Sequence, residues 1–273
     1  MRKTFRMLGF SNAKINLGLN IIEKRSDGYH NIESVFYPVG WTDILEVLPA
    51  ETFTFTTSGL PVPGEAAQNL VVKARNLLSP AQGNVKIHLH KILPMGAGIG
   101  GGSSNGAFAL KLMNTVLNLG LPAEQLLNLA GNLGSDCPFF IDNRPAFCHG
   151  TGTQFETTGL SLKGKFLVMI NPGIHISTAE AYAGITPRKP AVSVKDLVMQ
   201  PLPEWKNRLV NDFEAPLITK YPLIGELRQA LYTHGALYAS MTGSGSTVYG
   251  IWEKETDLSR LFADYTYWSG YLD

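Results

Sequence analysis

The chain is poor in cysteine and has no long apolar run. Its two cysteines, Cys137 and Cys148, are too few for a disulfide framework, and their spacing fits no usual zinc site. We therefore expect two reduced, buried thiols in a cytosolic protein. Because no stretch of about 20 apolar residues occurs, a membrane-spanning helix is not expected. Asn12 and Lys14 interrupt the sequence behind the basic N-terminus, so a signal peptide is not expected either.

An excess of charge of one sign is also lacking. Lys and Arg number 23 against 22 Asp and Glu, and the formal net charge is +1. This balance argues against a nucleic acid or a membrane surface as a partner attracted by bulk charge. We expect a cytoplasmic protein with neither kind of partner. At 273 residues, the chain is long enough for one large or two medium domains.

The sequence does contain a mixture of strand and helix patterns. Alternating or β-rich segments predict strands over residues 14–22 (half-buried), 34–39, 43–48, 52–57, 85–90, 166–170, 236–240 and 247–252. Helical patterns predict helices over residues 69–78, 105–113, 123–133, 224–234 and 257–262, the last of which ends the chain. This order of elements indicates an α+β fold with two domains, residues 1–160 and 161–273.

A glycine-rich run is the most informative segment. Five of the seven residues from Gly96 to Gly102 are glycine, and they lie between a predicted strand and a predicted helix. Without side chains, the backbone N–H groups can point at one anion, and the helix N-terminus adds a favourable dipole. We therefore predict a loop that binds the phosphates of a nucleotide. Its residues are Pro94, Met95, Gly96, Ala97, Gly98, Ile99, Gly100, Gly101, Gly102, Ser103 and Ser104.

Three kinds of nucleotide-binding loop compete as interpretations of this run. A Walker A loop requires a lysine directly after the glycines, and the next lysine here is Lys111. A dinucleotide fingerprint matches at Gly96, Gly98 and Gly101, but it needs an acidic residue about 20 positions further on. The first acid after the loop is Glu124, at the start of another predicted helix. The third kind, the phosphate loop of the GHMP small-molecule kinases, is the one that the run resembles.

Two further motifs carry charged side chains. Lys14 begins a strand within Asn12–Leu17, and Asp136 lies in a turn within Leu133–Phe140. Taken alone, they read as a solvated lysine and a turn aspartate. Taken together, they fit phosphoryl transfer to an alcohol, since a carboxylate can accept the hydroxyl proton while a lysine keeps it ionised and offsets phosphate charge. A third motif, Met241–Thr247, is either a plain hairpin turn or a small-residue loop that approaches the phosphate site.

These segments occur in the order in which GHMP kinases carry them, and the chain resembles that family from about Asn12 to about Gly250. The segment Arg25–Ile32 reads Arg-Ser-Asp-Gly-Tyr-His-Asn-Ile, which is similar to the signature of members whose substrate carries a cytidine diphosphate group. The resemblance implies a ribosomal-S5-like N-terminal domain and a ferredoxin-like C-terminal domain. It also implies ATP and Mg²⁺ as cofactors, and a hindered tertiary hydroxyl as the phosphoryl acceptor.

The resemblance implies roles for individual residues as well. It makes Lys14 and Asp136 the catalytic pair. The sequence does not identify the protein ligands of Mg²⁺, for which Ser103 or Ser104 is a candidate beside waters and phosphate oxygens. An aromatic side chain such as Tyr29 can stack on the cytosine base. The implied substrate-binding residues are Asn16, Tyr29, His30, Tyr182, Thr242 and Gly243.

Two positions depart from the family pattern. Thr153 stands where many relatives carry an acid, and Gly106 replaces a more usual alanine in a helix, at an expected cost of about 1 kcal/mol. Two alternative functions also remain open. One is a GHMP kinase that acts on a different small alcohol, and the other is a non-catalytic relative that only binds a nucleotide.

Overall fold

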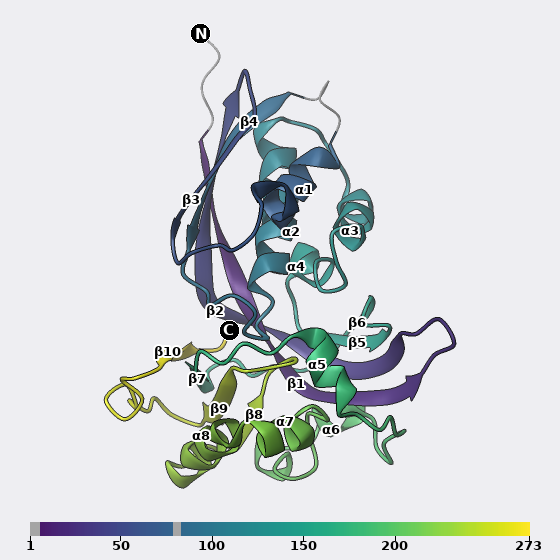
Figure 1. The fold of residues 1–273 in the computed structure, drawn as a ribbon, viewed down its shortest axis with the longest axis vertical. Coiled ribbons are helices and arrows are strands. Elements are labelled where there is room, and N and C mark those ends of the chain that lie inside the picture. The colour runs from purple at the N-terminus through teal and green to yellow at the C-terminus, as the bar shows by residue number, and fades with distance from the viewer. Residues whose placement is uncertain (1–5, 79–82) are drawn as a thin grey trace. The chain divides into compact units, whose positions relative to one another are not determined.

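The structure is a computed structural model that describes residues 6–78 and 83–273 (Figure 1). The chain divides into two compact units that are interleaved along the sequence. The first unit comprises Met1–Ala13, Trp41–Met95 and Gly100–Asn143, and the second comprises Lys14–Gly40, Gly96–Ile99 and Arg144–Asp273. The predicted division into two consecutive domains, residues 1–160 and 161–273, stays a prediction.

Two long strands, β1 (Met7–Lys24) and β2 (His30–Ala50), pair with each other and contribute to both units. The two strands predicted over residues 34–39 and 43–48 are therefore one. β2 pairs with β5 (Ala146–Gly150) through Ile32–Phe36 and with β4 (Asn84–Lys91) through Ile44–Ala50. Pro38 lies between these two ladders, so its missing N–H costs no hydrogen bond to either partner.

The first unit is a sheet with helices on one side (Figure 1). β3 (Thr54–Gly59) runs parallel to β4, which is antiparallel to β2. Val85, Ile87 and Leu89 of β4 are buried because alternate side chains face the helices. The helical elements are η1 (Ala66–Gln68), α1 (Leu70–Asn76), α2 (Gly101–Val116), α3 (Ala123–Gly131) and α4 (Phe139–Asp142).

Close packing of two helices in this unit explains Gly106. A Cβ atom at this position would lie 3.0 Å from Leu70 Cβ, so the glycine lets α1 and α2 approach each other. The expected cost in helix propensity is therefore offset by packing, which the helical pattern alone does not show.

The second unit contains the strand pairs β2–β5 and β5–β6 (Gln154–Thr157) and a separate antiparallel sheet of order β10–β7–β9–β8. The strands of that sheet are β7 (Phe166–Asn171), β8 (Tyr238–Met241), β9 (Val248–Trp252) and β10 (Thr266–Tyr271). The helical elements are α5 (Thr178–Ala183), α6 (Val194–Leu197), η3 (Leu202–Glu204), α7 (Glu214–Lys220) and α8 (Pro222–Thr233). Val168, Leu227 and Val248 belong to the core between this sheet and α8.

Two further sequence-based predictions about the elements were wrong. The chain does not end in a helix over residues 257–262: that segment forms turns and is followed by β10. The Asp257 carboxylate accepts a hydrogen bond from Ser259 N at 2.9 Å, which favours a turn, and the apolar spacing of Leu258 and Phe262 reflects burial in the core. β1 is also not half-buried, since every residue from Ser11 to Ile21 is buried.

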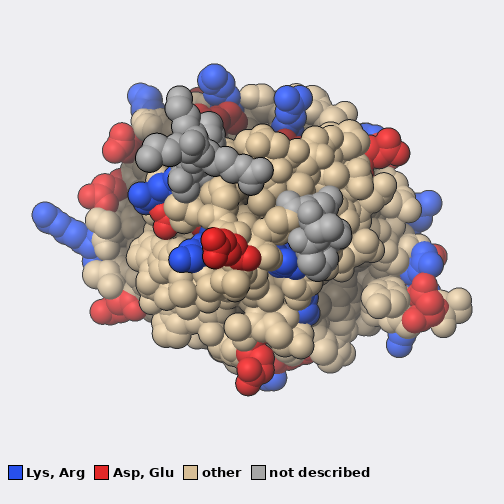
Figure 2. Space-filling model, turned by 90° about the horizontal axis from the view of Figure 1, so that it is seen from above, with Lys and Arg blue, Asp and Glu red and all other residues tan. Residues whose placement is uncertain are grey.

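The two cysteines are buried, as predicted, and neither forms a disulfide within the described residues. Burial raises the pKa of the Cys137 thiol to about 12. Among the described helices, none is long and apolar enough to cross a membrane. Basic and acidic side chains are intermixed among uncharged residues on the face drawn in Figure 2.

Candidate active site

The predicted phosphate loop leads into the N-terminus of α2. Gly100 is the N-cap residue with φ of 71°, and no side chain caps this end of the helix. The Ser104 hydroxyl is fully buried and has no hydrogen-bond partner among the described residues. An uncapped helix N-terminus with a spare buried hydroxyl suits an anionic ligand, because both supply unused hydrogen-bond donors.

Two glycine-containing loops of the second unit meet backbone to backbone. A Cβ atom on Gly98 would lie 2.2 Å from the Thr242 carbonyl oxygen, and one on Gly243 would lie 2.8 Å from the Gly98 carbonyl oxygen. Both glycines have positive φ, 75° and 57°, which side chains disfavour as well. The loop 242–246 is therefore more than a hairpin turn, since it packs directly on the predicted phosphate loop.

Lys14 is buried against the same loop. Its backbone N–H donates to Ile99 O at 2.9 Å, and its Nζ donates to Asn16 Oδ1 at 2.5 Å and to Gly98 O at 3.4 Å. The ammonium also lies 4.4 Å from the centroid of the Phe36 ring. Only 3% of Lys14 is exposed, so it is not the solvated lysine of the alternative interpretation. The contacts orient its charge towards the loop.

Asn16 and Thr242 connect this lysine to the second glycine loop. Asn16 N donates to Thr242 Oγ1 at 3.0 Å, and the Asn16 side-chain amide donates to Ser34 Oγ at 2.9 Å. Thr242 Oγ1 lies 3.2 Å from Gly98 O, to which it can donate. The structure thus brings the predicted site residues Lys14, Asn16, Gly98 and Thr242 together.

Sequence reasoning missed the residues that hold this second loop. The Asn211 side-chain amide donates to Met241 O and to Gly243 O, both at 2.9 Å. The buried Glu214 carboxylate accepts from Ser240 Oγ and from Met241 N, both at 2.6 Å. The only signal was a group of polar residues at the start of α7, Asn211, Asp212 and Glu214.

Asp136 lies in the first unit, in the turn between α3 and α4. It is partly exposed, and Ser135 Oγ donates to its Oδ1 at 3.2 Å. Burial raises the pKa of the neighbouring Cys137 thiol, and the side chain of Ser103, in the first turn of α2, opposes that rise. The turn that carries Asp136 is therefore adjacent to the end of the predicted phosphate loop.

The predicted base-binding residues lie in the second unit. The rings of His30 and Tyr182 stack with centroids 4.6 Å apart and an interplanar angle of 21°. Tyr182 is supported on its edge by Phe213, with centroids 4.9 Å apart. Tyr29 is 67% exposed, in a turn where its N–H donates to Asp27 Oδ1 at 3.1 Å. The structure thus places an exposed aromatic ring next in sequence to a stacked aromatic pair.

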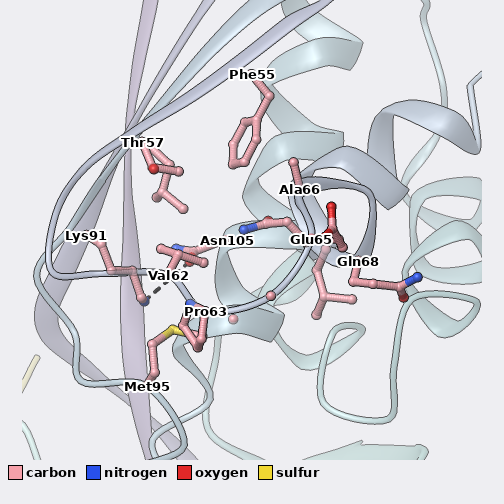
Figure 3. Close-up of a pocket in the computed structure, with 15 residues that line it drawn as sticks. Phe55, Thr57, Val62, Pro63, Glu65, Ala66, Gln68, Lys91, Met95 and Asn105 are labelled. Atoms are coloured by element: carbon pink, nitrogen blue, oxygen red, sulfur yellow. Dashed lines mark hydrogen bonds between the residues drawn. The ribbon is translucent and has the colours of Figure 1, made fainter.

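A cavity of about 370 Å³ opens in the first unit beside the phosphate loop (Figure 3). Met95 and Gly102 of the loop line it, together with residues of β3, β4 and the segment leading to α1. Its walls combine apolar side chains with a few polar groups, as ligand pockets commonly do. Representative lining residues are Phe55, Val62, Leu70, Gln68, Asn69 and Asn105.

Comparison with known proteins identifies the family of this chain. The model of the GHMP kinase N-terminal domain matches residues 69–151, and that of the GHMP kinase C-terminal domain matches residues 196–266. A 4-diphosphocytidyl-2-C-methyl-D-erythritol kinase of Parabacteroides distasonis is 47% identical over 270 residues, which cover 97% of this chain and 100% of the relative. The kinase of the same name from Cytophaga hutchinsonii is 48% identical over 254 residues, 92% of this chain and 94% of the relative.

Solved structures agree with this assignment. A crystal structure of 4-(cytidine 5'-diphospho)-2C-methyl-D-erythritol kinase superposes with a TM-score of 0.82 at 29% identity, covering 97% of this chain and 99% of that chain. The mevalonate kinase of Methanococcus jannaschii shares the fold, with a TM-score of 0.70 at 14% identity over the full length of both chains (100% each). The predicted α+β, two-domain GHMP kinase fold is confirmed. The chain belongs to the 4-diphosphocytidyl-2-C-methyl-D-erythritol kinase family of GHMP kinases, and it is an ATP-dependent small-molecule kinase.

Proposed function

We propose that this chain transfers the γ-phosphoryl group of ATP to the 2-hydroxyl of 4-diphosphocytidyl-2-C-methyl-D-erythritol, in non-mevalonate isoprenoid biosynthesis. The relatives that cover nearly the whole chain carry this substrate in their names. One structural observation supports the proposal most directly. The loop 242–246 and Lys14 both pack on the same glycine-rich loop.

Asp136 acts as the general base in this proposal, and Lys14 is its electrostatic partner. Both assignments are supported by contacts with the same continuous loop. Lys14 bonds to its Gly98–Ile99 portion, while the side chain of Ser103 in the same loop opposes the rise that burial causes in the pKa of the thiol of Cys137, the residue next to Asp136. The carboxylate takes the proton of the substrate hydroxyl as that oxygen bonds to the γ-phosphorus and the bond to the ADP oxygen breaks. Lys14 offsets charge on the transferring group.

ATP binds with its phosphates on the loop Pro94–Ser104 and its base in the cavity of the first unit. A cavity of about 370 Å³ that shares Met95 and Gly102 with the loop supports this placement. The unpartnered Ser104 hydroxyl fits a phosphate oxygen or a Mg²⁺ ion. In the described part of the chain, no group of three or more His, Cys, Asp or Glu side chains could hold a metal ion. The phosphates would therefore supply most ligands of Mg²⁺, which neutralises their charge.

The cytosine base binds at Tyr29, His30 and Tyr182, and Asn16, Thr242 and Gly243 help to place the rest of the substrate. The aromatic pair His30–Tyr182 and the exposed Tyr29 ring support this assignment, since bases stack on aromatic side chains. A cytoplasmic location, and the absence of nucleic-acid and membrane partners, belong to the same proposal.

Measuring ADP release with three alcohols tests the specificity. We expect turnover with the cytidyl substrate and little with homoserine or mevalonate. Equal or faster turnover with either of the latter two would show a different GHMP kinase. ATP binding without turnover on any of the three would favour a non-catalytic relative.

A further inference from the structure

A buried carboxylate lies beneath the phosphate loop, and the mechanism above does not use it. Asp43 on β2 is fully buried, with 0% exposure, and Lys91 at the end of β4 is 1% exposed. The two form a short ion pair. Both residues belong to the first unit, and Asp43 does not line the nucleotide cavity, whereas Lys91 does.

The Asp43 carboxylate accepts hydrogen bonds from both ends of the loop. On the entry side, Oδ1 accepts from the backbone N–H groups of Ile92 at 2.7 Å and Leu93 at 2.8 Å. On the exit side, Oδ2 accepts from the side-chain amide of Asn105 at 2.9 Å. Leu93 directly precedes Pro94 and Asn105 directly follows Ser104, so one carboxylate joins the two residues that flank the loop.

Lys91 and Ser11 complete this network. Lys91 Nζ donates to Asn105 Oδ1 at 3.4 Å, as Figure 3 shows, and Asn105 Nδ2 also lies 2.8 Å from Ser11 Oγ on β1. Burial lowers the pKa of Lys91, and the charge of Asp43 opposes that shift. The carboxylate thus keeps a cation in place under the loop where water cannot solvate it. A buried network with every member bonded is rigid and fixes the geometry of what it supports.

We propose that Asp43 is a positioning residue for phosphoryl transfer, because its carboxylate fixes the two ends of the glycine-rich loop relative to each other and so sets the loop geometry that binds the triphosphate. The loop has little side-chain packing of its own, since five of its central seven residues are glycine. Its shape therefore depends on its anchors. Asp43 acts through Lys91, Asn105 and the backbone, without touching ATP.

The test is a double-mutant cycle of Asp43→Asn and Asn105→Ala, with steady-state kinetics for ATP and for the cytidyl substrate. In Asp43→Asn, an amide N–H group takes the place of the oxygen that accepts from Lys91 Nζ and Asn105 Nδ2. Donors then face a donor, and both hydrogen bonds are lost. We expect each single variant to raise the KM for ATP at least tenfold, with the KM for the cytidyl substrate changing less than twofold. The double variant should raise the KM for ATP no further than Asp43→Asn does, because both changes break one anchor.

Tyr37→Phe is the matched control for lost stability. The Tyr37 hydroxyl is bonded to Leu162 N at 3.0 Å and Asp273 O at 2.8 Å in the second unit. Its removal should lower the unfolding midpoint and leave the KM for ATP within twofold. An Asp43→Asn enzyme that likewise loses only stability would overturn the inference, as would additive effects in the cycle.

A second cycle covers the case in which Asp43→Asn does not fold. Ser11→Ala and Asn105→Ala both leave the Lys91–Asp43 pair intact. Non-additive increases in the KM for ATP would support the anchor, and additive increases or none would contradict it. The inference rests on ATP binding at the loop. Calorimetric titration of the wild-type protein with ATP therefore separates failure of the anchor from failure of the proposed function.

Discussion

Gly98→Ala should disable the enzyme although it adds a single methyl group. The added Cβ would lie 2.2 Å from the Thr242 carbonyl oxygen, whereas non-bonded heavy atoms normally stay about 3.5 Å apart. Rotating a carbonyl cannot relieve this contact alone, because Gly245 O would lie only 3.0 Å away. The two loops must separate by about 1 Å, a displacement that costs on the order of 100-fold in rate at a catalytic site.

The backbone adds a second cost to this substitution. Gly98 has φ of 75°, a conformation that destabilises alanine by about 1–2 kcal/mol. We therefore expect kcat/KM to fall about 100-fold in a coupled assay of ADP release, together with a lower unfolding midpoint. Gly131→Ala in α3 is the control, since nothing lies within 4 Å of its added Cβ. A Gly98→Ala enzyme within threefold of wild type would refute the close loop contact.

Three further predictions concern other parts of the site. Thr242→Val leaves the buried Asn16 N–H without its acceptor, and an unpaired buried donor costs about 1–3 kcal/mol. We therefore expect kcat to fall about 10-fold or more. Unchanged kcat in steady-state assays would show that this bond does not orient Lys14. Tyr182→Ala should raise the KM for the cytidyl substrate about 10-fold or more and leave the KM for ATP unchanged, while Tyr182→Phe keeps the stack; equal KM values for the Ala and Phe variants would exclude a stacking role. Because burial raises the pKa of Cys137 to about 12, its thiol stays protonated at pH 8, and iodoacetamide should label it only after unfolding; rapid labelling of the native protein, seen by mass spectrometry, would contradict its burial.

The parts of the site that the sequence predicted are those whose chemistry is local. A glycine run before a helix, and a lysine on a strand, are readable because neighbouring residues define them, although Lys14 lies inside β1 and not at its start as predicted. The contact between Asn16 and Thr242 joins residues 226 positions apart, and only the family resemblance indicated it. Asn211 had no such indication, since its partners Met241 and Gly243 lie across the fold.

Asp43 did leave a signal that the sequence analysis overlooked. It shares the phase of Trp41, Leu45 and Val47 in an alternating strand, and these side chains are buried. An acid in the apolar phase predicts a buried, paired carboxylate. The partner Lys91 lies 48 positions further along the chain, so the pair itself needed the structure.

The central claim is that Asp136 is the base for a phosphoryl group held on the loop Pro94–Ser104. Asp136→Asn tests it most directly, with ATP affinity measured by calorimetry and turnover measured on the cytidyl substrate in the same preparation. The account predicts unchanged ATP affinity and a loss of turnover of about 10²–10⁴-fold. Full turnover in Asp136→Asn would contradict it.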